Sequence, residues 1–214
     1  MDQPGLEFTG PENAITGLLN LKVPFLSSRK QRVKYHLDSG GITHLDFHEI
    51  KAILRAADEL IVTGGRTILS KILKGSRDKK VLEHGLDQCP VYGFYRHLTL
   101  EEISNRVDFL IQNGYLEIVY SSRLPVIVFT EKGWEIEKET YAEELLQKLT
   151  ALLKGYDFSF VAELKDRNRG MILLLIEKIR KTKNPEFIPL LKAWHEIDYK
   201  KVRAALQEAI NDLM

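Results

Sequence analysis

Residues 65–93 read GRTILSKILKGSRDKKVLEHGLDQCPVYG, and this stretch, continued to Gly133, decides the fold. Its apolar residues change their spacing along the chain. From Ile68 to Leu73, apolar pairs recur four residues apart, so they share one face of a helix. Gly75 interrupts the pattern and marks the end of this first helix.

Two more helices follow within the stretch. Ser76 is a suitable N-cap for a short second helix through Lys80–Leu82. Thr99 and Glu102 have the spacing of a capping box, which predicts the start of a third helix. Gly114 is placed to end that helix.

A change to a period of two after Gly114 predicts a β-hairpin. Alternating apolar residues lie on both sides of a polar break at Ser121-Ser122-Arg123; they are Leu116, Ile118, Tyr120, Val126 and Val128. Three helices followed by a hairpin are typical of a winged helix, in which the hairpin is the wing. The sequence therefore predicts a mainly α fold with a small β-wing.

Four pieces of the stretch resemble the RQC domain of RecQ-type DNA helicases. They are ILKGSRDKKVLEHGLD with its Lys74-Gly75-Ser76 turn, the pair Tyr92-Gly93, LIQNGYLEI, and the closing VIVFTEKG with Thr130-x-Lys132-Gly133. The resemblance covers about 65 residues, roughly a third of the chain. Nothing outside it resembles a helicase motor. It implies a winged helix that binds DNA, and we expect it to act as a stand-alone RQC-domain protein.

Basic residues gather in the first part of the stretch. Between positions 66 and 80 a single acid, Asp78, accompanies six cations: Arg66, Lys71, Lys74, Arg77, Lys79 and Lys80. Free N–H groups from Ser76 onward would add a phosphate site at a helix N-terminus. The resemblance places phosphate contacts at this turn, and a solvated helical face is the alternative.

The third helix carries acids where an ordinary winged helix reads bases. Glu101 and Glu102 would repel the phosphates on either side of a major groove. The resemblance implies an approach to duplex ends and branched DNA through the second helix, the start of the third helix and the wing. The DNA-binding candidates around that start are Arg96, His97, Thr99 and Arg106.

The wing tip supplies the remaining candidates, which are Tyr120, Ser121, Ser122 and Arg123. In several RecQ-type helicases an aromatic residue near the tip stacks on the terminal base pair. Tyr120 has this position, and packing of Tyr120 on its own sheet is the alternative. Pro125 is expected to shorten the hairpin. Since duplex stacking contributes about 1.4 kcal/mol per step, a wing without ATP chemistry could trap frayed ends but not open a duplex processively.

Composition limits the class of protein. The chain has 214 residues and a net charge of only +1, so DNA binding must depend on local basic patches.

No apolar run reaches the roughly 18 residues that span a bilayer. The start, MDQPGLEF, lacks the features of a signal peptide, which predicts a cytoplasmic protein. Cys89 is the single cysteine, so the four-cysteine zinc module common in RecQ helicases cannot be built from this sequence.

Catalytic motifs do not occur in the sequence. It has neither a G-x-x-x-x-G-K-[ST] phosphate loop nor a G-x-S-x-G nucleophile motif. His44 and His48 are four residues apart, but Leu45 breaks the HExxH pattern of a zinc site. Glu49 and Lys51 resemble a nuclease E-x-K pair, although their helical surroundings indicate surface charge. We expect no enzyme activity, no cofactor and no metal.

The flanking regions are expected to be helical. Ahead of the winged helix, apolar spacing from Ile50 to Ile61 predicts a helix that packs on it. A basic run at Arg29, Lys30, Arg32 and Lys34 is either a solvated helix start or an accessory phosphate-binding surface. The helices expected after Gly133 are Trp134–Leu153, Phe158–Lys165, Arg169–Lys181 and a closing pair split at Asp198, which would cap the last helix.

The final segment FIPLLKAWHEIDYKKVRAALQEAI weakly resembles a HEAT-type helical hairpin, and a small docking or dimerisation domain is the alternative. The expected domains are an N-terminal arm and helices (1–62), an RQC-like winged helix (63–134), a connecting helix (135–155) and a C-terminal helical domain (156–214).

These predictions together favour a non-catalytic protein that binds duplex ends or branched DNA in repair, recombination or replication. Its C-terminal helices would recruit a protein partner. A winged-helix transcriptional regulator and a protein-interaction scaffold are the alternative functions.

Overall fold

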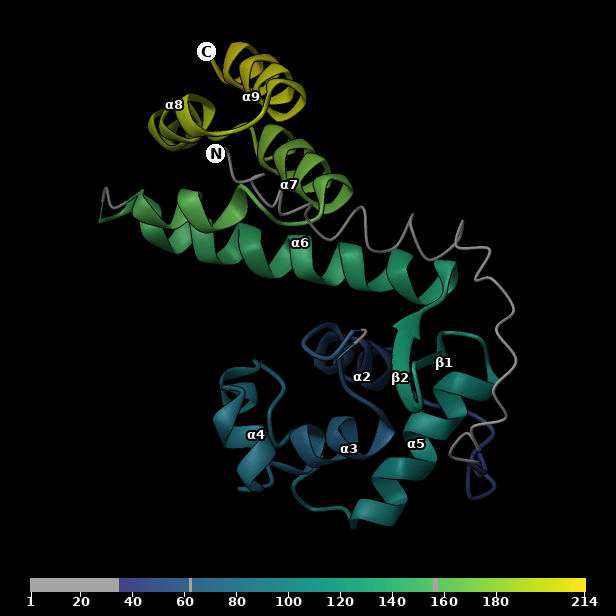
Figure 1. Cartoon of the computed structure of the whole chain (residues 1–214). Helices are drawn as coiled ribbons and strands as arrows, with labels where there is room; N and C mark the ends of the chain where they lie inside the picture. The colour runs from purple at the N-terminus through teal and green to yellow at the C-terminus, as the bar shows by residue number, and fades with distance from the viewer. Residues whose placement is uncertain (1–34, 62, 156–157) are drawn as a thin grey trace, which may run out of the picture. The chain divides into compact units, whose positions relative to one another are not determined.

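The computed structural model describes residues 35–61, 63–155 and 158–214 (Figure 1). They divide into two compact units, one that runs to Thr140 and one that begins at Tyr141. Helix α6 (Glu131–Leu153) contributes residues to both. The basic run predicted at Arg29–Lys34 lies outside the described residues.

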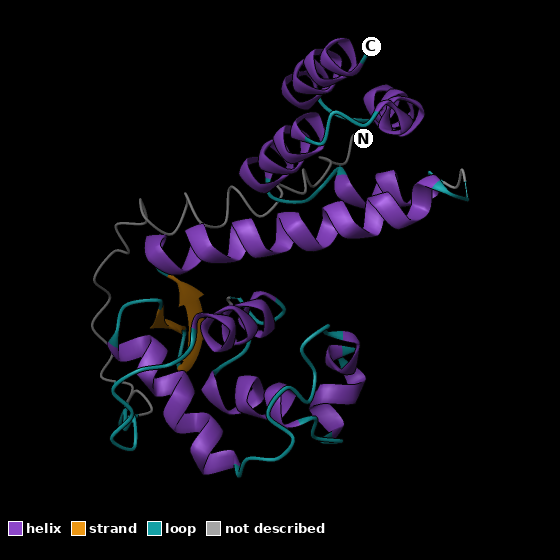
Figure 2. Ribbon diagram, turned by 180° about the vertical axis from the view of Figure 1, so that it is seen from behind, coloured by secondary structure: helices purple, strands orange, loops and turns teal. Residues whose placement is uncertain are grey.

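The first unit is a winged helix, which confirms the predicted fold class. Its elements are α2 (Phe47–Asp58), α3 (Arg66–Lys74), α4 (Lys79–Glu83), the 3₁₀ turn η1 (Leu86–Gln88), α5 (Leu100–Gln112), β1 (Leu116–Ser121) and β2 (Leu124–Phe129). The two strands pair antiparallel as a hairpin, coloured orange in Figure 2.

One hydrophobic core joins α2, α3, α5 and the hairpin. Fully buried residues from all of these elements meet in it, namely Ile53, Leu54, Leu69, Ile72, Leu73, Ile103, Leu110, Leu116 and Ile127. The expected packing of α2 on the winged helix is thereby confirmed. The four-part domain division stays a prediction, and its boundary at 62–63 runs through this core.

The junction of α3 and α4 differs from the prediction. Gly75 ends α3 in the left-handed conformation, φ 74°, and the Ser76 N–H donates to the Lys71 carbonyl at 2.9 Å. Ser76 therefore belongs to the end of α3, and its prediction as the cap of the next helix was wrong. Asp78 caps α4, because its carboxylate accepts from the Lys80 N–H at 3.0 Å. The Ser76 amide that was expected to be free for a phosphate is already bonded.

The ends of α5 are as predicted. The Thr99 hydroxyl accepts from the Glu102 N–H at 3.2 Å, and the Glu102 carboxylate accepts from the Thr99 N–H at 2.7 Å. This is a complete capping box. Gly114 has φ 67°, the left-handed conformation typical of the residue that follows a helix.

The hairpin reaches its full length despite Pro125. Ser121 pairs with Leu124, and Tyr120 pairs with Pro125, so only Ser122 and Arg123 form the turn. In a two-residue hairpin the pair next to the turn exchanges hydrogen bonds and the following pair does not, so the N–H that proline lacks is not needed there. The expectation that Pro125 shortens the hairpin was wrong.

The motif Thr130-x-Lys132-Gly133 fastens the start of α6 to the end of α5. The Thr130 hydroxyl accepts from the Gly133 N–H at 3.1 Å, and the Lys132 ammonium donates to the Asn113 carbonyl at 3.1 Å. A Cβ on Gly133 would lie 1.9 Å from the Tyr115 carbonyl oxygen. Only glycine fits, which explains this part of the motif structurally.

The second unit is helical throughout its described elements, which are the remainder of α6, the 3₁₀ turns η2 (Ser159–Leu164) and η3 (Pro185–Phe187), α7 (Arg169–Lys181), α8 (Ile188–Ile197) and α9 (Lys200–Leu213). α7 and α8 both pack on α9. The α7 prediction is confirmed. The Asp198 prediction is corrected: Tyr199 is the cap of α9, while Asp198 ends α8 and accepts from Trp194 Nε1 at 2.7 Å. A HEAT-type array stays a prediction.

Candidate nucleic-acid interface

Two motifs that are distant in sequence, Lys74-Gly75-Ser76 and Tyr92-Gly93, touch in the structure. A Cβ on Gly75 would lie 3.0 Å from the Gly93 Cα, and both glycines have φ 74°. The Tyr92 hydroxyl donates to the Ser76 carbonyl at 3.1 Å. These contacts hold the end of α3 beside the loop that precedes α5.

Two predicted DNA-binding lysines on α3 are engaged within the protein. Lys74 donates to the carbonyls of Arg96 and Leu98 at 2.8 and 2.6 Å. The Lys71 ammonium lies 2.7 Å from the Asp78 carboxylate, and its hydrogen bond lowers the pKa of Asp78. Both lysines are therefore partly buried, and their ammonium groups stabilise the turn.

Two predicted DNA-binding arginines are also paired. Nη1 of Arg66 lies 2.6 Å from the buried Asp108 carboxylate. Nε of Arg106 lies 3.5 Å from Glu49, and the Arg106 guanidinium is 5.4 Å from the Tyr95 ring centre. Glu49 was expected to be surface charge, and this was wrong: it also accepts from the Tyr95 hydroxyl at 2.8 Å. Burial and this carboxylate raise the pKa of Tyr95 above its ordinary value.

Five more of the predicted basic residues are exposed. We call them the basic surface, which comprises Arg77, Lys79, Lys80, Arg96 and His97. Arg77, Lys79 and Lys80 follow α3, and the other two lie in the loop that the Gly75–Gly93 contact holds beside it. The Lys79 side chain is 83% exposed, with its ammonium 3.5 Å from Glu83. Five of the candidate residues thus come together on neighbouring segments.

The other candidates lie at the start of α5 and on the wing. The Thr99 hydroxyl is occupied by the capping box. Ser121, Ser122 and Arg123 are exposed at the wing tip. Tyr120 is half-buried, and its ring centre is 6.2 Å from that of Tyr35. Sequence reasoning missed Tyr35, because no local pattern links it to the wing.

The first turn of α5 is acidic, as predicted. Glu101 and Glu102 are both exposed there. Hydrogen bonds from the N–H and hydroxyl of Thr99 lower the pKa of Glu102, so this carboxyl is charged at neutral pH. The negative start of α5 therefore adjoins a loop in which two exposed residues, Arg96 and His97, are basic.

Residues 35–61, 63–155 and 158–214 contain neither a candidate metal cluster nor a candidate membrane span. Among those residues, no group of histidine, cysteine, aspartate or glutamate side chains could hold a metal ion. None of the helices there is both long enough and apolar enough to cross a bilayer.

Comparison with known proteins identifies the winged-helix region. The family model of the RQC domain matches residues 46–148. The match confirms the resemblance and includes α2, which the predicted domain at 63–134 left out. The chain is 32% identical over 74 residues to the ATP-dependent DNA helicase RecQ of Bacillus subtilis (strain 168), an alignment that covers 35% of this chain and 12% of the helicase. No solved structure matches the chain.

Proposed function

We propose that this protein binds duplex ends or branched DNA through its RQC domain, without catalysing a reaction. The basic surface carries this proposal, because its side chains are exposed while the cations on α3 are partly buried and bonded to groups of the protein. Lysine and arginine that face solvent can neutralise phosphates and release counterions, which is the main source of affinity for DNA.

The acids of α5 favour an end or a branch over a continuous groove. In an ordinary winged helix the start of this helix enters the major groove between two phosphate strands. Here Glu101 and Glu102 occupy that start, and the nearest cations lie beside it rather than on it. At a duplex end or a fork, the basic surface can contact the phosphate backbone of one strand while Glu101 and Glu102 point away from the backbone of the other strand.

The wing tip has a composition that suits a terminal base pair. Leu124, the first residue of β2, is 66% exposed and directly follows Arg123 of the two-residue turn. An exposed apolar side chain beside a cation can contact the flat face of a base pair while the cation contacts a phosphate. A preference for ends and forks would place the protein in DNA repair, recombination or replication.

The test is fluorescence anisotropy with blunt duplex, forked and single-stranded DNA of equal length over a range of salt concentrations. The charge-reversal variant Arg77→Glu/Lys79→Glu/Lys80→Glu should lose at least tenfold in affinity, because three phosphate contacts become repulsive. The matched control reverses three exposed cations at the start of α9, Lys200, Lys201 and Arg203. It should bind within twofold of the wild type.

Circular dichroism would establish that both variants are folded. Preferred binding to forks and ends by the wild type supports the proposal. Tight binding to a single duplex sequence would indicate a transcriptional regulator. Absence of binding to any DNA at low salt would contradict the proposal and favour the scaffold function.

A further inference from the structure

The N-terminal ends of α7 and α9 lie side by side in the second unit. The two helices pack on each other (Figure 1). Shortly before they begin, the Tyr199 hydroxyl donates to the Asp166 carboxylate at 3.4 Å. Near their other ends, Nη1 of Arg180 lies 3.6 Å from the Asp212 carboxylate. The helices are therefore parallel, and the positive ends of their dipoles meet at one edge of the unit.

This edge carries cations where helices favour acids. Arg169 is the first residue of α7, and Lys200, Lys201 and Arg203 lie at the start of α9. Neither helix has an acid in its first turn, whereas α2, α5 and α6 each have one there. A cation at the N-terminal end opposes the helix dipole and lowers stability. Features that oppose folding in this way are expected at functional sites.

Three of these cations are available to a partner. The side chains of Lys200, Lys201 and Arg203 are exposed. Among the residues that the structure describes, none of the three forms an ion pair. Lys200 and Arg203 are three positions apart, so they share one face of α9. Their charges can therefore act together on one ligand.

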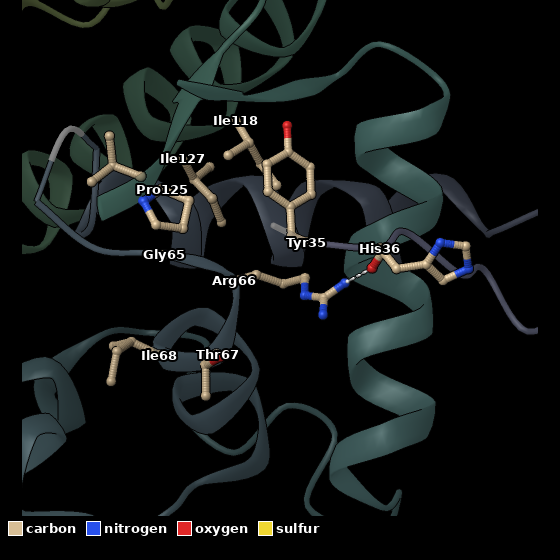
Figure 3. Close-up of a pocket in the computed structure, with 10 residues that line it drawn as sticks. Tyr35, His36, Gly65, Arg66, Thr67, Ile68, Ile118, Pro125 and Ile127 are labelled. Carbon is tan, nitrogen blue, oxygen red and sulfur yellow. Dashed lines mark hydrogen bonds between the residues drawn. The ribbon is translucent and has the colours of Figure 1, made fainter. Parts of the chain in front are cut away.

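Cations that stabilise the fold are bonded within the protein. In the second unit, the Lys178 ammonium lies 3.1 Å from the Glu143 carboxylate. In the winged helix, Arg66 donates to the His36 carbonyl at 2.9 Å, the bond dashed in Figure 3. The three exposed cations of α9 make no comparable contact, which favours a role in binding.

An exposed aromatic side chain lies beside these cations. Tyr199 is 54% exposed and directly precedes Lys200. The Lys165 ammonium lies 5.1 Å from the Tyr199 ring centre, and Asp166 bonds the hydroxyl. A ring held in this way next to free cations offers an apolar contact and positive charge together. This combination suits a peptide that carries both acidic and apolar side chains.

Neighbouring acids favour a peptide over DNA at this edge. Asp166 is exposed at the Tyr199 hydroxyl, and Glu196 is exposed three residues before Tyr199. A nucleotide stacked on Tyr199 would bring its phosphate close to Asp166, and the two negative charges would repel. A peptide carries its carboxylates on separate flexible side chains, so they can reach the cations while its backbone passes Asp166.

We propose that Tyr199, Lys200, Lys201 and Arg203, which we call the α9 surface, bind an acidic segment of a partner protein. The α9 surface lies outside the RQC match at 46–148 and is distinct from the basic surface of the winged helix. The inference adds a protein-binding site to the proposed function and does not depend on DNA binding.

The test is fluorescence anisotropy of the full chain at low salt with a labelled peptide of glutamates that has two leucines at its centre. A control peptide has glutamine in place of every glutamate. The wild type should bind the acidic peptide about tenfold more tightly than the control peptide. Lys200→Glu/Lys201→Glu/Arg203→Glu should lose this preference, whereas Arg77→Glu/Lys79→Glu/Lys80→Glu should keep it.

Two further measurements separate binding from folding. Glutamates at the start of α9 favour the helix dipole, so the α9 reversal variant should have a midpoint of thermal unfolding equal to or above that of the wild type. Tyr199→Ala should weaken binding of the acidic peptide about fivefold, because an aromatic anchor is lost. Tyr199→Phe should bind like the wild type, because the ring is kept.

The outcomes also separate this inference from the proposed function. Equal binding of the two peptides, or an undiminished preference in the folded α9 reversal variant, would overturn the inference. Loss of affinity for single-stranded DNA rather than for the peptide in that variant would assign the α9 surface to DNA and overturn it as well. Failure of the wild type to bind any DNA would contradict the proposed function alone.

Discussion

The cations of α3 and those of the segment that follows it, Arg77 to Lys80, have similar sequence surroundings but different structural roles. On α3, Arg66 pairs with a buried carboxylate, and Lys74 bonds two backbone carbonyls. In the segment after α3, the arginine and both lysines are exposed. The difference shows that a count of positive charge in a sequence overstates the charge available to DNA. On α3 the cations stabilise the protein, and after α3 they remain available for binding.

The largest effect that would test this comparison is on stability, at Arg66. Arg66→Ala should lower the free energy of unfolding by about 3 kcal/mol, because Asp108 would remain buried without its cation. Arg77→Ala, the matched control, should change it by less than about 0.5 kcal/mol and weaken DNA binding instead. Urea denaturation measures the first quantity and anisotropy the second. Equal stability of the two variants would contradict the distinction.

A second prediction compares two lysines. Lys74→Gln should cost about 2 kcal/mol of stability, since two charge-assisted hydrogen bonds to carbonyls are lost. The slope of log affinity against log salt should stay unchanged for this variant. Lys80→Gln should do the reverse, with normal stability and a slope smaller by about 1. The comparison fails if the two substitutions change the slope equally.

A third prediction concerns Asp78, the acid within the segment from Arg77 to Lys80. Asp78→Asn keeps a good N-cap for α4 but removes the partner of Lys71. DNA affinity should rise about twofold to fivefold at low salt, because one negative charge is lost and one cation is released. Asp166→Asn, in the second unit, is the control and should leave affinity unchanged. A fall in affinity for Asp78→Asn would show that Lys71 is not released.

The smallest effect is a change in titration. The hydrogen bond from Lys71 lowers the pKa of Asp78 below its ordinary value of 3.8. Stability from this pair is therefore fully present above pH 3.8 and is lost as the pH falls through the lower value in the folded protein. In an NMR titration the Asp78 midpoint should rise towards 3.8 in Lys71→Gln. An unchanged midpoint would mean that Lys71 is not the cause.

Local patterns in the sequence were sufficient to predict most of the fold. The Thr99–Glu102 capping box, Gly114 and the spacing of apolar residues defined α5 and the hairpin, because each is set by residues close in sequence. Ser76 was misassigned because a serine after Gly75 has the composition of an N-cap, whereas its N–H closes the preceding helix. Asp78, two residues later, had the same capping chemistry.

The pairing of Lys74 and Arg66 could not be predicted from local patterns, because their partners are distant in the sequence. Lys74 bonds backbone carbonyls, which leave no mark in a sequence, and their approach depends on the contact between Gly75 and Gly93. One signal was available for Arg66. Asp108 lies between Val107 and Phe109 in an amphipathic helix, and a buried carboxylate there requires a cation.

The most direct test of the central claim is the salt dependence of fork binding by Arg77→Gln/Lys79→Gln/Lys80→Gln. Each phosphate contact contributes about 0.9 to the slope of log affinity against log salt. If the basic surface binds the backbone, the slope of this folded variant should be smaller than that of the wild type by about 2.7. An unchanged slope would contradict the claim that these exposed cations, rather than those on α3, contact DNA.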